Sequence, residues 1–403
     1  MNYARGIRSL VFLTLVISAL TLTVTGDAGA AATHSNHGQA SKFNLDAVFA
    51  QAGGGSIAPC RMVYDPYPTF AQIAIDPKNH MAVISDNSSA SLLVYDINKT
   101  GVNRAGITPY LARLKGEATH IDSPLGVALD PEARRIYFSD NDIAETLGSF
   151  PYGANGNYPA STLAIHVGGS GLGLSQRLQQ KALAEEDLGI IMIFRLNATG
   201  AEPPLREIRG IHTQIADPRG LYWDDVHHEI TIANDGNWNP GYWDADYTGG
   251  GRYLPPSVVT FDDGAKNDAR PKRVIQGSNT QLNWPFQVAV DPVHNELAVA
   301  NLGGNSVLIF KRTASGNVAP IRVLSGPHTG IITPTGVAFD VIHDEIWVAN
   351  YGHKAMAFPR TAEGDASPTR IIRSAPAGSA VVGVSLPYNL TYDPRRDELL
   401  VKN

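Results

Sequence analysis

The chain has 403 residues, of which 32 are Lys or Arg and 38 are Asp or Glu, giving a formal charge of -6 and a pI near 6.0. This acidic balance argues against nucleic acid and against an anionic membrane surface as partners, because both attract a basic face. A single cysteine, Cys60, excludes an intrachain disulfide framework.

The first residues are typical of a cleaved secretory signal. Arg5 and Arg8 precede an apolar run over residues 10–24, and small residues follow at 28–32. We therefore expect 1–32 to be a signal peptide and 33–403 to be a secreted or periplasmic chain with no membrane contact after cleavage. An uncleaved anchor is the alternative.

One unit recurs six times: a proline (Phe70 in the first copy), a small residue, an apolar run ending in aspartate, a turn, and a second apolar run ending in Asp or Asn. Its clearest copy is TPTGVAFDVIHDEIWVAN at residues 333–350. Such alternation predicts two antiparallel strands joined by a tight turn. The first aspartates are Asp76, Asp130, Asp224, Asp291, Asp340 and Asp393, and ten residues later stand Asp86, Asp140, Asn234, Asn301, Asn350 and Asn403.

Most units continue with a third strand that ends in Phe, and a fourth strand that contains Arg twelve residues later, as in Phe310 and Arg322. The last unit ends before these strands, but Phe49 and Arg61 near the N-terminus keep the same spacing. We therefore expect strands at 45–50 and 57–63 to complete the last sheet. This predicts one all-β domain, a six-bladed β-propeller closed by its N-terminal strands, in preference to an open β-solenoid.

The segments SPLGVALD with IYFSD and TPTGVAFD with IWVAN resemble NHL-repeat six-bladed propellers. The resemblance covers nearly all of 33–403 and implies the propeller fold. It implies no single activity, because this fold carries lactonases, lyases and binding modules.

Two insertions, at 141–188 and 235–256, lie between the second and third strands of neighbouring units, so we expect both over one mouth of the central channel. The second insertion contains Trp238, Tyr242 and Trp243 among acidic residues. Aromatic rings beside acceptors suit sugars or other amphipathic ligands. The alternative is that these rings pack the insertion onto the disc.

Further candidate residues come from departures within the repeat. Gln72, Gln287 and Asn389 replace the glycine that other units carry four residues before the first aspartate, and we expect them to line the channel as contacts to a ligand or to water. His212 and His328 lie in crossovers between units and are candidate ligand contacts. Convergent oxygens of Asp86, Asp140, Asn234, Asn301 and Asn350 suit calcium, although a turn role explains a residue present in every unit.

The sequence assigns no reaction, because neither HExxH nor a P-loop nor G-x-S-x-G occurs. The first hypothesis is a monomer that binds a small-molecule, carbohydrate-like or protein ligand on the inserted face. The second is a calcium-dependent lactonase or esterase, implied by a distant similarity to gluconolactonase-like and paraoxonase-like propellers, whose metal ligand position matches Asp86 and Asp140. The Asn that those families carry after the proline is replaced here by Leu125, Arg219, Phe286, Thr335 and Tyr388.

Overall fold

The computed structural model describes residues 9–15, 52–65, 72–99, 108–121, 123–140, 189–210, 212–235, 255–351, 353–373, 384 and 387–402. Among them the regular structure is β-strand, with three short 3₁₀ helices at Glu117–Thr119, Ser278–Thr280 and Leu302–Gly304. None of the described helices is long and apolar enough to cross a membrane.

Five sheets repeat one antiparallel meander of four strands, as the repeated sequence predicts. Sheet 1 contains β4 (Ile73–Asp76), β5 (Met81–Asp86), β6 (Ser91–Asp96) and β7 (Ala112–Leu114). Sheet 2 contains β8 (Pro124–Asp130), β9 (Arg135–Asp140), β10 (Ile190–Arg195) and β11 (Arg206–Ile208). Sheet 3 contains β12 (Pro218–Asp224), β13 (Glu229–Asn234), β14 (Ser257–Asp262) and β15 (Arg273–Gln276). Sheet 4 contains β16 (Pro285–Asp291), β17 (Glu296–Asn301), β18 (Ser306–Lys311) and β19 (Arg322–Leu324). Sheet 5 contains β20 (Pro334–Asp340), β21 (Glu345–Asn350), β22 (Lys354–Pro359) and β23 (Arg370–Arg373).

The sixth sheet has a different construction. It begins with the antiparallel pair β24 (Asn389–Asp393) and β25 (Glu398–Lys402), and continues with β1 (Ser9–Leu15) and β3 (Arg61–Asp65). β1 runs parallel to both of its neighbours, whereas the third strand of every other sheet runs antiparallel to them. β1 also lies within the segment expected to be a signal peptide, and the strand expected at 45–50 lies outside the described residues.

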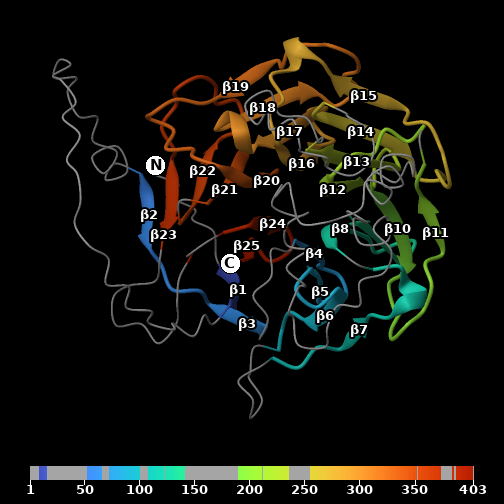
Figure 1. The fold of residues 1–403 in the computed structure, drawn as a ribbon. Helices are drawn as coiled ribbons and strands as arrows, with labels where there is room; N and C mark the ends of the chain where they lie inside the picture. The colour runs from blue at the N-terminus through green and yellow to red at the C-terminus, as the bar shows by residue number, and fades with distance from the viewer. Residues whose placement is uncertain are drawn as a thin grey trace, which may run out of the picture.

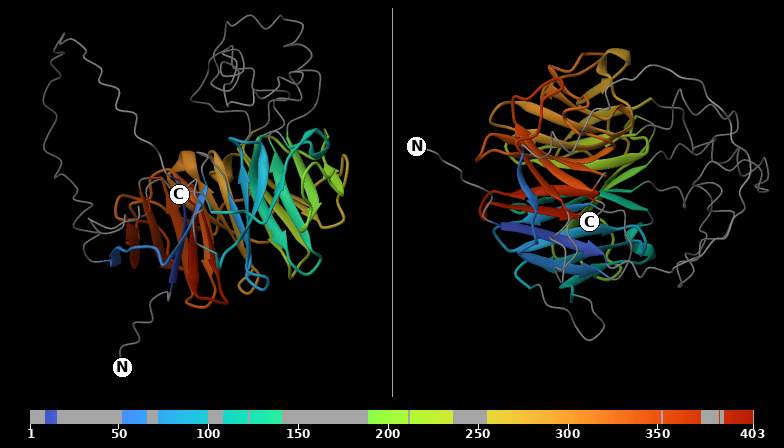
Figure 2. Two further views of the ribbon diagram at one scale, coloured as in Figure 1. Left: turned by 90° about the horizontal axis from the view of Figure 1, so that it is seen from below. Right: turned by 90° about the vertical axis from the view of Figure 1, so that its left-hand side faces the viewer.

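The sheets surround one axis, as the ring in Figure 1 and the two edge views in Figure 2 show. The innermost strands contact one another in the order β4, β8, β12, β16, β20, β24 and back to β4. Six clusters of buried apolar side chains each join two neighbouring sheets, including one that joins Val63 and Leu400 of the sixth sheet to Ile73 of the first. The fold is therefore an all-β propeller whose core lies between its sheets.

From residue 53 onwards, the described N-terminal residues occupy the positions that the repeat predicts for them. In each of four junctions, the fourth strand of one sheet bridges in parallel to a residue six positions after the third-strand aromatic of the next sheet, for example Leu324 to Gly364. At the fifth junction β2 (Gly53–Ser56) takes this place, with Gly55 opposite Ile372. The strand expected at 57–63 begins at Arg61 instead, because Pro59 has no N–H to donate to a sheet.

Candidate functional site

The strand ends from which both insertions start lie at one face of the propeller. In sheets 2 to 5 the repeat proline of the first strand lies opposite the Asp or Asn that ends the second strand, for example Pro218 opposite Asn234. The insertions follow Asp140 and Asn234, so both start at this end of their sheets, which we call the insertion face. The residues that follow the repeat prolines form the mouth of the axis on the same face.

Three side-chain amides fill the axis below this mouth. Gln72, Gln287 and Asn389 are 3%, 8% and 0% exposed. A Cβ atom added at Gly220 would lie 2.7 Å from Gln72 Nε2 and 2.8 Å from Gln287 Cα. The missing side chains at Gly220 and Gly336 therefore leave space that the amides of Gln72 and Gln287 occupy.

The amides are only partly satisfied. Asn389 Oδ1 accepts a hydrogen bond from the Ile73 N–H at 3.2 Å, and Gln287 Oε1 accepts from the Val337 N–H at 3.3 Å. Gln72 Oε1 and Asn389 Nδ2 are buried and have no hydrogen-bond partner among the described residues. A buried acceptor and a buried donor in one narrow space suit a bound water or the polar group of a ligand.

An ion pair lies at the mouth above the amides. Arg219, directly after Pro218, donates from Nε to Asp235 Oδ2 at 2.6 Å. The guanidinium lies 5.8 Å from the centroid of the Phe286 ring, and this ring meets the Tyr388 ring edge to face at 5.0 Å. A cation, a carboxylate and two aromatic rings from sheets 3, 4 and 6 therefore converge where a ligand would enter.

Burial shifts the pKa values of the ionisable side chains at the mouth. It raises the pKa of Asp235 to about 6, although the charge of Arg219 acts in the opposite direction. For Arg219, burial favours the neutral form, but Asp235 and Tyr388 outweigh it and hold its pKa above the usual value. Burial also raises the pKa of Tyr388 to about 12. Asp235 Oδ1 is buried and has no partner among the described residues.

The side chains of the Asp and Asn ring accept hydrogen bonds from backbone N–H groups. Asn234, Asn301 and Asn350 each accept a hydrogen bond from an N–H in the loop before the first strand, at 3.3, 2.6 and 2.7 Å. Asp140 accepts from the Ser123 N–H at 2.9 Å, and Asp86 accepts from the Ser89 N–H at 3.1 Å. This arrangement favours the turn role, and calcium binding by the ring stays a prediction. In the described part of the chain, the three-residue group suited to a metal is Asp340, His343 and Asp397, on the opposite face.

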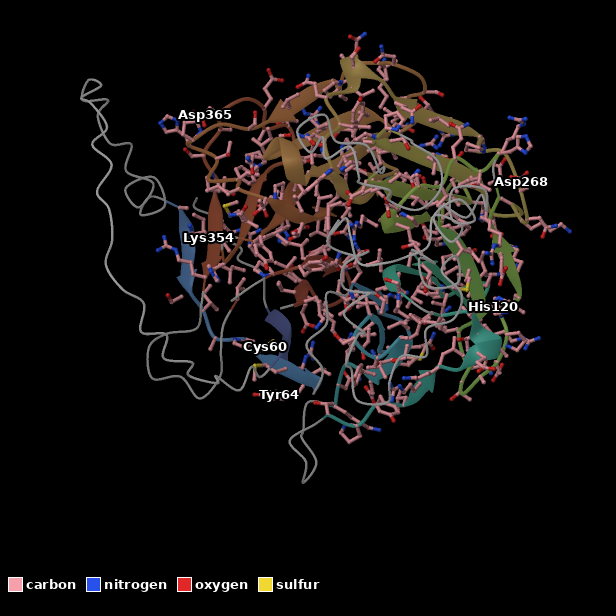
Figure 3. All side chains as sticks on the ribbon, in the orientation of Figure 1. Cys60, Tyr64, His120, Asp268, Lys354 and Asp365 are labelled. Carbon is pink, nitrogen blue, oxygen red and sulfur yellow. The ribbon has the colours of Figure 1, made fainter. Side chains whose placement is uncertain are left out.

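The histidines lie away from the mouth. His212 Nδ1 contacts Asp268 Oδ2 at 2.5 Å, and His328 Nδ1 contacts Asp365 in the same way. Figure 3 shows Asp268 and Asp365 at the rim of the disc, far from its centre. Each histidine therefore joins a crossover to the next sheet at the periphery of the disc. A ligand role for His212 and His328 stays a prediction.

Trp238, Tyr242 and Trp243 lie outside the described residues. We call Arg219, Asp235, Phe286 and Tyr388 the mouth group. The sequence did not predict it as a site. It marked Arg219, Phe286 and Tyr388 only as departures from an Asn position, and Asp235 only as part of an insertion. A usable signal existed, because Arg219 and Asp235 directly follow the paired Pro218 and Asn234.

Comparisons with known proteins add little to this geometry. No family model matches the chain, and no curated protein matches it. Among solved structures 1303 chains match. One of them, in the crystal structure of a nidogen/laminin complex, has a TM-score of 0.47 and 14% identity, covering 80% of this chain and 83% of that chain. At this level the likeness carries no argument about function, and the propeller assignment rests on the sheets themselves.

Proposed function

We propose that this chain is a secreted, six-bladed propeller of NHL type that binds a small-molecule, carbohydrate-like or protein ligand on its insertion face. The observation that carries the proposal is the mouth group. Its ion pair offers charge and a carboxylate oxygen without a hydrogen-bond partner, and its two aromatic rings offer apolar contact. The amides below have further polar atoms without a partner. Ligand sites combine these features.

The six-bladed form is supported by two relationships at the junction of the chain ends. Arg61 pairs with Glu398, as Arg322 pairs with Glu296 in sheet 4. β25 and β3 run parallel to each other, so a strand antiparallel to both would complete the meander found in the other sheets. We propose that residues 45–50 supply this strand once the signal peptide is removed, since they precede β2 and β3 in the chain as the third strand precedes the fourth in the other sheets.

A calcium-dependent hydrolase is the second candidate. The favourable observation is Asp235, because a carboxyl group with a pKa near 6 can take or give a proton at neutral pH. The ring oxygens fit calcium poorly, because each of those described above already accepts a backbone N–H. We therefore assign no step to a metal.

Binding is tested with a panel of glycans, metabolites and proteins, using purified 33–403 and a matched Arg219→Gln, Tyr388→Ala variant. We expect at least one ligand that binds saturably to the wild type and at least tenfold more weakly to the variant. A ligand that binds both proteins equally places the site elsewhere. Turnover of lactones or esters that is lost with chelator would favour the hydrolase.

A further inference from the structure

Arg219 uses only part of its hydrogen-bonding capacity. Nε donates to Asp235, and neither Nη atom donates to a described residue. Neither Nη atom is among the buried atoms without a partner, and the side chain is 28% exposed. The edge that carries Nη1 and Nη2 is therefore open, and this edge matches two oxygens of one planar anion.

Asp235 completes a site at the same place. The residue is 7% exposed, its Oδ2 accepts from Arg219, and its Oδ1 is the buried oxygen without a partner. A buried, unpartnered oxygen beside an open guanidinium edge calls for a ligand group that bonds both.

We propose that the mouth binds a small carboxylate, whose two oxygens accept from Arg219 Nη1 and Nη2 while Asp235 Oδ1 shares a proton with one of them. This inference rests on the proposed binding function and names the class of ligand. The rings of Phe286 and Tyr388 give the body of the ligand an apolar wall.

Charge favours a carboxylate over a phosphate. Arg219 supplies the positive charge that acts on Asp235, and Asp217 adds a further negative charge nearby. A phosphate monoester carries about -1.5 to -2 charges at neutral pH and would meet this carboxylate with a single guanidinium to balance it. A planar monoanion matches one guanidinium in both charge and shape.

Binding is then linked to protonation. The charged or titratable groups that act on Asp235 are Arg219 and Asp217, and those that act on Tyr388 are Arg219, Asp235 and Tyr351. An anion on Arg219 further favours the protonated form of Asp235, whose pKa is about 6 without ligand. If the anion binds mainly this form, the affinity rises about tenfold between pH 7 and pH 5.

The test uses titration calorimetry on 33–403 with D-glucuronate, D-glucuronamide, D-glucose and glucose 6-phosphate at pH 5 and pH 7. D-Glucuronate is expected to bind at least tenfold more tightly than its amide and than D-glucose, with proton uptake at pH 7. Arg219→Gln should abolish this preference, and Asp235→Asn should remove the pH dependence while retaining the preference. Arg195→Gln is the control, since this exposed guanidinium pairs with Glu202 in sheet 2, away from the mouth.

The outcomes separate the two proposals. Equal binding of D-glucuronate, its amide and D-glucose overturns the carboxylate class and leaves the binding function standing. Tighter binding of glucose 6-phosphate overturns it in favour of a phosphate. Failure of all four probes also overturns the inference, whereas the binding function falls only if the wider panel of glycans, metabolites and proteins fails too. Pronounced pH dependence that survives in Asp235→Asn excludes Asp235 as the linked group.

Discussion

Arg135 in sheet 2 and Asp263 in sheet 3 form an ion pair, with Nη1 at 2.9 and 2.8 Å from the two carboxylate oxygens. It is the charge-reversed counterpart of the pair at the next junction, where Glu229 of sheet 3 contacts Arg312 of sheet 4 at 2.7 Å. Glu296 and Arg360 repeat the second version between sheets 4 and 5 at 3.1 Å. Oppositely charged residues at equivalent positions therefore join neighbouring sheets, and the sheet that carries the cation differs from one junction to the next.

Exchanging this pair should be tolerated only when both residues change. Arg135→Glu and Asp263→Arg alone should each cost ~1–2 kcal/mol of unfolding free energy, because each leaves like charges facing one another in a site whose side chains are 29% exposed. The double variant should recover most of this loss. Its new carboxylate would meet Arg206 and the new guanidinium, as Glu229 meets Arg273 and Arg312. Urea denaturation in a double-mutant cycle measures the coupling, and strictly additive losses would contradict an interchangeable junction.

Glu229 should make the propeller sensitive to acid. Burial favours its neutral form, but hydrogen bonds from Arg273 and Lys272 outweigh burial and hold its pKa at about 2, against 4.5 in the unfolded chain. A carboxyl with a depressed pKa contributes stability that is present above pH 4.5 and is lost as the pH falls through about 2. Glu229→Gln should therefore melt lower at pH 7 and lose less on acidification than the wild type. Glu132→Gln is the control, because this side chain is 80% exposed. It should leave both the melting temperature at pH 7 and the loss of stability on acidification unchanged.

Asp235 should act in the opposite sense. Its folded pKa of about 6 lies above the ordinary value of 3.8, so the folded state gains nothing from its ionisation and loses stability as the pH rises from 3.8 to 6. The shift corresponds to roughly 2–3 kcal/mol. Relative to Asp235→Asn, the wild type should therefore become less stable between pH 4 and pH 7, as followed by thermal melting. Parallel melting profiles for wild type, Asp235→Asn and the exposed control Asp225→Asn would show that Asp235 titrates normally.

Adding even one methyl group at Gly220 should destabilise the fold. A Cβ atom there would lie 2.7 Å from Gln72 Nε2 and 2.8 Å from the Gln287 backbone. Gly220→Ala should therefore cost ~1–3 kcal/mol, the usual penalty of overpacking. Gly264→Ala is a matched control, because a Cβ atom there meets nothing within 4 Å. An equal effect of the two substitutions on the melting temperature would mean that the amides move aside freely.

The repeat predicted the parts of the fold that depend on spacing. Strand pairs such as Pro334 opposite Asn350, and turn histidines such as His294 on Asp291, follow directly from positions in the unit. The contact of Phe286 with Tyr388 could not be predicted in this way, because the two rings come from sheets 4 and 6 and meet only when the ring closes. The pKa of Asp235 depends on burial, which a pattern of residues does not give. No periodicity in the sequence predicted β1.

Closure of the ring by the N-terminal segment can be tested by two deletions. Met62 and Val63 are 7% and 1% exposed; Met62 packs against the fifth sheet and Val63 against the first. Each apolar side chain removed from a core costs ~1.5–3 kcal/mol, and the β2 and β3 hydrogen bonds would be lost too, against ~5–15 kcal/mol for a typical domain. Deleting 33–65 should therefore cause unfolding or aggregation, because the sixth sheet would lose β3 and β23 would lose β2, which leaves an exposed edge on both sheets.

Deleting 1–32 separates the two possible third strands of the sixth sheet. If residues 45–50 fill the position between β25 and β3, this deletion should leave the melting temperature unchanged, since the antiparallel strand forms from the chain that remains. If β1 is needed there, the deletion should destabilise the protein nearly as much as loss of 33–65. A soluble 33–65 deletion with an unchanged cooperative melt would contradict both arrangements, because neither β2 nor β3 would then be required to close the ring.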